Sequence, residues 1–368
     1  MPTSSPVEHS CSINYPLPHI MAVGTATSAT KYTQQELLEI FNIQDPRIQA
    51  IFLNSWIQQR ALTLPLTDKK ILRTETQGEL IRKHTEVGIA MAKEAILTCL
   101  KESQTSLLDV GYLCCVSSTG FITPGFSALL IKELGLSHYC ARLDVVGMGC
   151  NAGLNGLAAV TGWAKANPGS IALLVCIEVC SAAYISDNTI RTAVVNSLFA
   201  DGAAAISITT TKNKQPFKMP KPAILHFASY LITDAIDAMR YEWDDEQGKF
   251  SFFLDQETPY IIGSHVESAF QHLLEKTPIH FSDVKHWLIH SGGKKVIDAI
   301  RLNLGLTRYD LRHTINVLRD YGNVSSGSFL FSYERLLQET VAAPGDYGIM
   351  MTMGPGSTIE MALLQWQI

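Results

Sequence analysis

The chain has 368 residues, of which 46% are apolar and 17% are charged, and its formal net charge is −5. This composition is typical of a globular protein large enough for one big domain or two packed halves. The negative balance argues against a general polyanion binder, so no nucleic-acid partner is expected, and a phosphate-bearing ligand would need a local basic patch.

The N-terminal stretch carries no Lys or Arg before Lys31, so it lacks the charged start of a signal peptide. The most apolar run, IALLVCIEVCSAAYI, is short and is interrupted by Glu178, which argues against a membrane span. The eight cysteines include no CxxC pair. We therefore expect reduced thiols, a cytoplasmic protein and no metal site, since CIEVC lacks both the usual spacing and a nearby histidine.

Apolar, β-rich runs alternate with stretches of helical periodicity along the chain. Helices are predicted over 34–42 and 84–103. Buried strands are predicted over 111–120, 171–179, 202–210, 286–292 and 347–353. The alternation predicts an α/β fold with a buried sheet.

One stretch, TTTKNKQPFKMPKPA at 209–223, has four lysines, three prolines and almost no core character. Such a composition is typical of a connecting segment, and it predicts two halves, 1–214 and 215–368. A surface hairpin loop within a single domain is the alternative.

Cys150 lies in RLDVVGMGCNAGLNGLAAVTGWAKANPG, where a strand over 143–148, a turn at Gly149 and a helix over 151–166 are predicted. At such a corner, the free N–H groups and the dipole of the helix stabilise a thiolate and lower the thiol pKa. The pattern indicates a nucleophile. A buried cysteine that only fills space is the alternative.

A nucleophilic cysteine needs a base and a group that holds an oxyanion. His290 ends an apolar strand before a Gly-Gly turn and a helix, and Asn323 precedes another helix, for which Ser325 and Ser326 are predicted caps. Three turns that open helices can aim their side chains into one cavity. Taken singly, His290 reads as a surface residue and Asn323 as a turn residue.

Four segments, GMGCNAG, HSGGKKVID, YGNVSSGSFLF and MGPGSTIEMALL, occur in this order. They resemble the motifs of the type III polyketide synthases, the chalcone-synthase group, and the similarity covers nearly the whole chain after about residue 20. The resemblance implies a thiolase-like layered αβαβα fold built from two similar halves, the first carrying the cysteine and the second the histidine and asparagine. It also implies a homodimer.

The same resemblance implies roles for the three residues. Cys150 would carry the growing acyl chain as a thioester. His290 and Asn323 would hold the thioester carbonyl of malonyl-CoA during decarboxylation, and His290 would pair with the thiolate of Cys150. No cofactor is implied beyond the CoA thioester substrates.

Further residues are assigned by resemblance. Phe199 matches a gatekeeper between the cavity and the CoA tunnel, and either Phe252 or Phe253 matches the second gatekeeper. Arg60 falls in the basic cluster that binds CoA phosphates, where two glutamines precede it here. The following residues match positions around the cavity: Ser118, Thr123, Ala183, Ser325, Gly354, Pro355 and Gly356. Thr123 would reach into the partner's cavity, and Ala183 replaces a hydroxyl found in chalcone synthases.

Stretches such as FLNSWIQQRALTLP and ITDAIDAMRYEWD are similar to bacterial members that make 3,5-dihydroxyphenylacetyl-CoA, a secondary-metabolite and antibiotic precursor. Four malonyl-CoA units, serving as starter and extender, are then expected. The alternatives are a synthase that uses another acyl-CoA starter and makes pyrones or resorcinols, a Cys-His-Asn thioester hydrolase, and an inactive scaffold. Enoyl-CoA-hydratase-like accessory proteins are expected partners.

Overall fold

The computed structural model describes residues 16–69, 71–185, 187, 189–210 and 216–368. The strands are β1 (Pro18–Thr27), β2 (Lys31–Thr33), β3 (Gln59–Ala61), β4 (Val110–Val116), β5 (Ala141–Val145), β6 (Ile171–Glu178), β7 (Gly202–Thr210), β8 (Lys221–Leu231), β9 (Met239–Asp244), β10 (Lys249–Leu254), β11 (Val284–Ile289), β12 (Tyr347–Gly354) and β13 (Thr358–Gln367). The helices are α1 (Gln34–Ile40), α2 (Pro46–Leu53), α3 (Gln77–Ser103), α4 (Phe126–Leu134), α5 (Ala152–Ala166), α6 (Ile190–Leu198), α7 (Thr258–Leu274), α8 (Lys294–Asn303), α9 (Arg312–Tyr321) and α10 (Ser328–Glu339).

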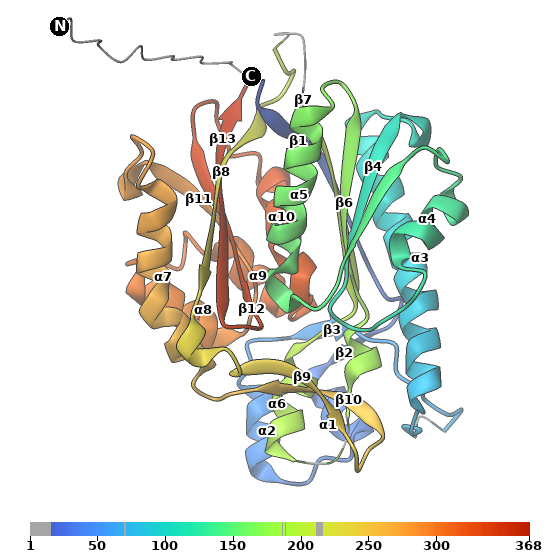
Figure 1. The fold of residues 1–368 in the computed structure, drawn as a ribbon. Helices are drawn as coiled ribbons and strands as arrows, with labels where there is room; N and C mark the ends of the chain where they lie inside the picture. The colour runs from blue at the N-terminus through green and yellow to red at the C-terminus, as the bar shows by residue number, and fades with distance from the viewer. Residues whose placement is uncertain (1–15, 70, 186, 188, 211–215) are drawn as a thin grey trace, which may run out of the picture.

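A nine-stranded sheet runs through the molecule in the order β11-β12-β13-β8-β1-β7-β6-β4-β5 (Figure 1). In one half, β5, β4 and β6 are parallel and are followed by antiparallel β7 and β1. In the other, β11 and β12 are parallel and are followed by antiparallel β13 and β8. The halves meet at β1 and β8, which pair only at His19 and Ala223. The predicted construction from two similar halves is confirmed.

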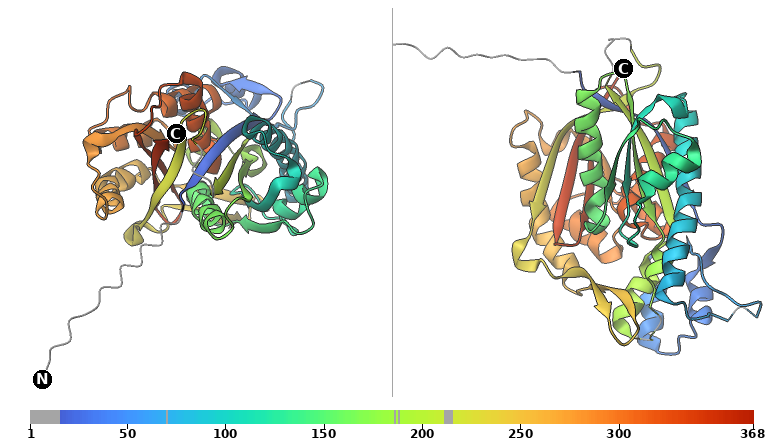
Figure 2. Two further views of the ribbon diagram at one scale, coloured as in Figure 1. Left: turned by 90° about the horizontal axis from the view of Figure 1, so that it is seen from above. Right: turned by 45° about the vertical axis from the view of Figure 1, so that its right-hand side comes forward.

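Helices form three layers around the two halves of the sheet. Helices α5 and α10 each contact strands of both halves and so form the buried central layer (Figure 1). Helix α3 covers the outer face at β1, β6 and β7, whereas α7 packs on β8 and β13 and against α8. Figure 2 shows the layers from two further sides. The arrangement confirms the expected layered αβαβα fold.

The central strands form because their residues are apolar or small on both faces. Every residue of β6 and β7 is buried, as expected for strands covered by helices on both sides. The predicted strands and helices all occur, although α3 begins at Gln77, seven residues before the predicted start. The predicted boundary at 214/215 lies in 211–215, outside the described residues. Because β1 lies between β7 and β8, these two strands do not pair with each other as a hairpin.

A smaller layer closes one end of the sheet. It contains α1, α2, α6, the two-stranded sheet of β2 and β3, and the β9–β10 hairpin, which lie together at the bottom of the view in Figure 1. Segments from both halves of the chain thus meet beneath the sheet. Across the described ranges, no helix is long and apolar enough to cross a membrane.

Candidate active site

Cys150 lies in a short 3-10 turn, Gly149–Asn151, directly before α5, and its residue is 7% exposed. Gly149 has a φ of 72°, and a Cβ there would lie 2.3 Å from Pro355, so only glycine fits. Gly153, one turn into α5, lies so close to the start of the next motif that its Cβ would be 2.3 Å from the Ser326 carbonyl oxygen. Two glycines therefore fix where the cysteine can lie.

His290 follows β11 and is buried. Its backbone N–H donates to the Met351 carbonyl at 2.8 Å, and its Nδ1 is hydrogen-bonded to the Ser328 hydroxyl. Its ring also hydrogen-bonds to the backbone of Ser325. Burial lowers the pKa of His290 to about 4, so the imidazole is neutral near pH 7.

Asn323 follows Gly322, whose φ of 75° makes the turn out of α9. Its backbone N–H donates to the Leu198 carbonyl at 2.8 Å, and its side-chain Oδ1 accepts the Ser325 N–H at 2.8 Å. In the part of the chain that the structure describes, no acceptor engages its Nδ2. With Oδ1 engaged, the amide group presents its N–H bonds as donors.

Ser325 is the residue on which the three predicted groups converge. Its hydroxyl lies 3.2 Å from the Cys150 sulfur and 2.8 Å from the Ser118 hydroxyl. Its backbone binds Asn323 and His290, as described above, and its φ is 42°. We predicted Ser325 and Ser326 as helix caps, which is wrong: the first turns of this segment carry no side-chain cap hydrogen bond. The hydroxyls point to the site instead.

Glu178 is the functional-site neighbour that sequence reasoning missed. It is fully buried at the end of β6 and accepts hydrogen bonds from the Ser118 N–H at 3.0 Å, the Ser118 hydroxyl at 2.9 Å and the Ser326 hydroxyl. Burial raises the pKa of Glu178 to about 7. The sequence feature that could have revealed Glu178 was a lone carboxylate inside an apolar strand. We used this feature only to argue against a membrane span.

The expected lowering of the Cys150 pKa is not observed. Burial raises the pKa of the Cys150 thiol to about 12, and the nearby carboxyl of Glu178 raises it too, whereas the hydrogen bond from Ser325 opposes both. The position before α5 does not outweigh this burial. Among the described residues, the sulfur has no hydrogen bond to His290, so the site holds a neutral thiol and a neutral imidazole.

A cavity of about 200 Å³ opens beside Cys150. The predicted residues that line it are Cys150, Ser118, Ala183, Phe199, Phe252, Ser325 and Pro355. Residues that the sequence did not single out include Ser117, Thr119, Phe121, Val195, Tyr241 and Phe250. None of the described lining residues carries a charge, but several carry hydroxyl groups.

The structure distinguishes the two candidates for the second gatekeeper by their position relative to the cavity. The rings of Phe199 and Phe252 meet edge to face, with centroids 5.6 Å apart, and both line the cavity. Phe253 points to the other face of its hairpin, where the Arg240 guanidinium lies 3.9 Å from its ring centroid. Of the two alternatives, Phe252 is the cavity residue.

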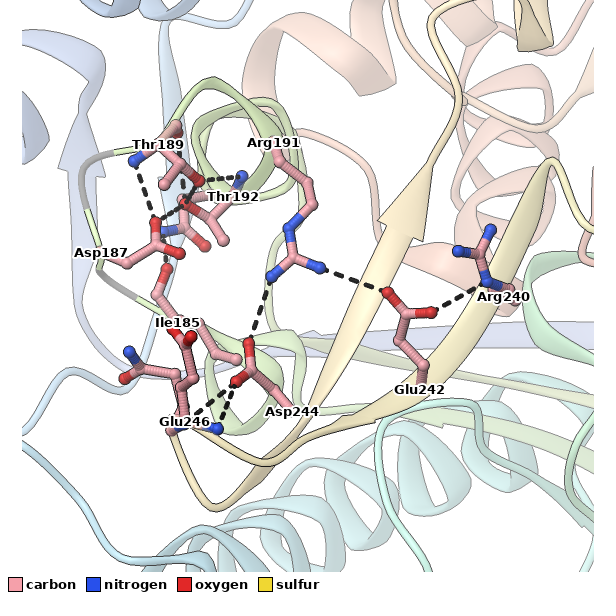
Figure 3. Close-up of polar contacts among 11 residues, drawn as sticks. Ile185, Asp187, Thr189, Arg191, Thr192, Arg240, Glu242, Asp244 and Glu246 are labelled. Atoms are coloured by element: carbon pink, nitrogen blue, oxygen red, sulfur yellow. Dashed lines mark hydrogen bonds and ion pairs between the residues drawn. The ribbon is translucent and has the colours of Figure 1, made fainter.

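An ion-pair clasp holds the β9–β10 hairpin against α6. Arg191 of α6 contacts Glu242 at 3.3 Å and Asp244 at 3.2 Å, both on β9 (Figure 3). The neighbouring hairpin residues Tyr241 and Phe252 line the cavity. The clasp therefore fixes one wall of the site from outside.

The prediction that Arg60 binds CoA phosphates is wrong as the structure places it. Its side chain is fully buried, and its guanidinium donates to Gln34 Oε1 at 3.2 Å, the Tyr184 hydroxyl at 2.6 Å, the Phe199 carbonyl at 2.5 Å and the Asn196 carbonyl. These donors leave no face for a phosphate. Arg60 instead holds the backbone of Phe199.

The remaining predicted residues, His290, Asn323, Gly354, Gly356 and Thr123, are not among the described residues that line the cavity. Gly354 ends β12 against the Cys150 turn, where a Cβ would lie 2.4 Å from Asn151 Oδ1, and Gly356 has a φ of 78° in the turn to β13. Thr123 is exposed and does not line the cavity of its own chain. Its predicted role in a partner's cavity stays a prediction.

Family models, known proteins and a solved structure match this chain over most of its length. Residues 12–212 match the N-terminal domain of chalcone and stilbene synthases, and residues 236–366 match the C-terminal domain. A 3,5-dihydroxyphenylacetyl-CoA synthase from Streptomyces toyocaensis is 58% identical over 353 residues, covering 95% of this chain and 90% of the relative. One from Amycolatopsis balhimycina is 57% identical over 94% of this chain and 92% of the relative. The crystal structure of PKS-I from the brown alga Ectocarpus siliculosus, 27% identical, superposes with a TM-score of 0.86 over 96% of this chain and 99% of that one.

Proposed function

The chain belongs to the chalcone and stilbene synthase family, and from this membership we propose that it condenses four malonyl-CoA units into 3,5-dihydroxyphenylacetyl-CoA. As a type III polyketide synthase it is an acyltransferase that joins carbon units by decarboxylation. The relatives at 58% and 57% identity carry the name of the proposed activity. The observation that carries the proposal is the convergence of Cys150, His290 and Asn323 on Ser325 beside a cavity.

Loading begins at a neutral thiol. Cys150 attacks the thioester carbonyl of malonyl-CoA, its proton passes to His290, and CoA leaves as a thiol after taking a proton. Nδ1 of His290 is hydrogen-bonded to Ser328, so we assign the proton transfer to Nε2. The raised pKa of Cys150 and the lowered pKa of His290 mean that the ion pair forms only transiently, when substrate is bound.

Extension uses two hydrogen-bond donors, His290 and Asn323. His290, with Nε2 keeping the proton taken from Cys150 while the departing CoA takes its proton from solvent, and the Asn323 amide donate hydrogen bonds to the thioester oxygen of a second malonyl-CoA, so that loss of CO2 leaves a stabilised enolate. The enolate carbon attacks the acyl thioester on Cys150, and the sulfur leaves. The lengthened chain then returns to Cys150, and two further rounds give a chain of four units that retains the starter carboxylate.

Ring closure follows from the chemistry of that chain. Loss of the starter carboxylate as CO2 generates a carbanion at the far end, which attacks the ketone at the third carbon from the thioester. Six carbons close the ring, loss of water aromatises it, and the two remaining ketones become hydroxyls meta to the side chain. Four malonyl-CoA thus give one product, three CoA, four CO2 and one water. Because every step is acyl transfer, decarboxylation, addition of a carbanion to a carbonyl or dehydration, we propose that no metal or redox cofactor is needed.

The size and lining of the cavity favour a short starter acyl group over a long one. Its volume of about 200 Å³ is below the roughly 300–1,000 Å³ of pockets that enclose drug-sized ligands. Hydroxyls of Ser117, Ser118 and Thr119 in the lining can solvate a carboxylate. A fatty acyl starter would need a longer tunnel beside Cys150.

The test is to incubate the purified protein with malonyl-CoA alone and identify the products by mass spectrometry. We expect 3,5-dihydroxyphenylacetyl-CoA or its free acid. Turnover that requires a second acyl-CoA would overturn the proposed product but keep the family, and formation of malonate or acetate alone would indicate a thioester hydrolase.

We also propose that the chain works as a homodimer in the cytoplasm. Phe121, Val146 and Met148 are exposed apolar residues, Phe121 and Val146 line the cavity, and Thr123 follows Phe121 by two residues. Burying them against a second copy would remove apolar surface from water. Sedimentation of the purified protein tests this proposal. Accessory proteins related to enoyl-CoA hydratases stay a prediction.

A further inference from the structure

The phenol of Tyr241 is a hydrogen-bond donor in the cavity that the steps described above do not use. Tyr241 lies on β9 and is one of the residues that line the cavity beside Cys150. Its ring contacts two phenylalanines of β10, with its centroid 6.0 Å from that of Phe250 and 5.9 Å from that of Phe252. Both phenylalanines line the cavity as well. These aromatic contacts hold the phenol in the cavity wall.

The Tyr241 hydroxyl differs from the other hydroxyl groups in the lining. Four of these have hydrogen-bond partners within the protein, namely those of Ser117, Ser118, Thr119 and Ser325. The Tyr241 hydroxyl has no hydrogen-bond partner in the described part of the chain. A phenol carries one O–H bond, so it can donate to a ligand oxygen without breaking a bond inside the protein.

The surroundings of the hydroxyl place it near the nucleophile. Although the residue as a whole is 37% exposed, burial raises the pKa of the Tyr241 hydroxyl, and Cys180 and Glu178 raise it further. Cys180 also lines the cavity, and Glu178 raises the pKa of Cys150 as well. Because the effect of a charge falls with distance, the phenol oxygen and the Cys150 sulfur lie toward the same end of the cavity. Near neutral pH the phenol keeps its proton and is a donor.

An acyl chain on Cys150 carries oxygen on its third carbon both at the start and at the end of the proposed reaction. Counted from the thioester carbonyl, the third carbon of a malonyl group is its carboxylate carbon. In the finished chain of four units, the third carbon is the ketone that the terminal carbanion attacks. The described residues that line the cavity carry no charge, so a carboxylate there depends on hydrogen bonds.

We propose that Tyr241 donates a hydrogen bond to the oxygen on the third carbon of the acyl chain bound to Cys150, and that it is a further catalytic residue. The inference rests on the proposed function for the identity of that chain. At loading, this hydrogen bond selects a starter that carries a carboxylate. At ring closure, the new carbon–carbon bond forms at the third carbon, the electron pair of its C=O bond moves to the oxygen, and the phenol stabilises this alkoxide. The alkoxide then takes a proton from solvent, and the resulting hydroxyl leaves as water with a hydrogen of the neighbouring carbon.

The test compares loading from malonyl-CoA and from acetyl-CoA, whose acyl groups differ only in the carboxylate. With enzyme in excess, each molecule is acylated at most once, and rapid quenching with intact-protein mass spectrometry gives the rate of transfer to Cys150. Tyr241→Phe keeps the aromatic contacts and removes only the hydroxyl. We expect malonyl transfer to slow at least about tenfold relative to acetyl transfer, since a hydrogen bond to a charged group is worth at least that factor.

Tyr260→Phe is the matched control, because Tyr260 is 66% exposed on α7 and is not among the described residues of the cavity lining. It should change neither rate. An unchanged ratio of malonyl to acetyl transfer in Tyr241→Phe would overturn the proposal. Equal slowing of both transfers would also overturn it, because the phenol would then only support the cavity wall. If the wild type makes no aromatic product from malonyl-CoA alone, the proposed product fails, but the two loading rates still test the role of Tyr241 separately.

Discussion

The hydroxyl of Ser325 lies 3.2 Å from the sulfur of Cys150, and the backbone of the same serine binds both His290 and Asn323. Ser325 therefore connects Cys150, the proposed nucleophile, with His290 and Asn323, the two proposed donors, and it does so from a left-handed backbone conformation. Its hydrogen bond lowers the pKa of Cys150 against the opposing effect of burial. The reactivity of the thiol depends on this contact.

Ser325→Ala should slow alkylation of Cys150 by iodoacetamide at pH 8 several-fold. Removing the hydroxyl raises the pKa of the thiol further, and the reactive species is the thiolate. Ser325→Gly is the matched variant, since glycine tolerates the positive φ but also lacks the hydroxyl. Slowing in the alanine variant alone would show that backbone strain, and not the hydrogen bond, controls the sulfur.

Glu178→Gln should remove a pH dependence of stability. The folded pKa of about 7 lies above the ordinary value of 4.5, so the folded protein keeps a proton that the unfolded chain loses, and stability falls as the pH rises from about 4.5 to 7. The full change in the free energy of unfolding over this pH range is roughly 3 kcal/mol. Urea unfolding at pH 4.5 and 7.5 measures the free energy of unfolding at each pH. An equal change between the two pH values in the wild type and in the glutamine variant would contradict the account.

Arg191→Gln should loosen the β9–β10 hairpin. Two ion pairs to Glu242 and Asp244 are lost, worth together about 1 kcal/mol. We expect faster backbone hydrogen exchange over 239–254 and a higher KM. The control is Arg47→Gln, which breaks an exposed pair with Asp45, and neither residue lines the cavity. Exchange that rises equally in both variants would mean that the clasp does not hold the hairpin.

Arg60→Met should destabilise the fold by roughly 3 kcal/mol, because it leaves buried acceptors without a donor. Thermal unfolding and the relative KM values for malonyl-CoA and malonyl-pantetheine measure the effect. If Arg60 is structural, the two KM values change by the same factor. A loss confined to malonyl-CoA would restore the original prediction that Arg60 binds phosphate.

The sequence predicted the parts of the site that depend on local pattern. The turn glycine at 149 and the helix after it placed Cys150 at a corner, and the apolar strand before His290 placed the imidazole at another. The failures concern burial, which a single sequence does not reveal. The pKa of Cys150 rises because the corner is buried between two halves, and Arg60 is enclosed by residues more than a hundred positions away along the chain.

Contacts between distant segments also could not be predicted from the sequence. Ser325 and Ser326 have the residue types of helix caps, yet they bind Cys150, Ser118 and Glu178, and this choice depends on how α5 and α10 meet. In the same way, the ring of Trp56 meets Lys294 and Arg308, which come from two other segments of the chain. Resemblance supplied the convergence of the trio, but not the residue at its centre.

The most direct measurement is the release of CO2 from malonyl-CoA by variants that lack the nucleophile. Cys150→Ala should still convert malonyl-CoA to acetyl-CoA without extending it, because His290 and Asn323 hold the thioester oxygen on their own. Adding Asn323→Ala should slow this decarboxylation about a hundredfold, the usual loss when one oxyanion donor is removed. Equal rates in the single and double variants would show that the amide does not face the thioester, and the proposed site would be wrong.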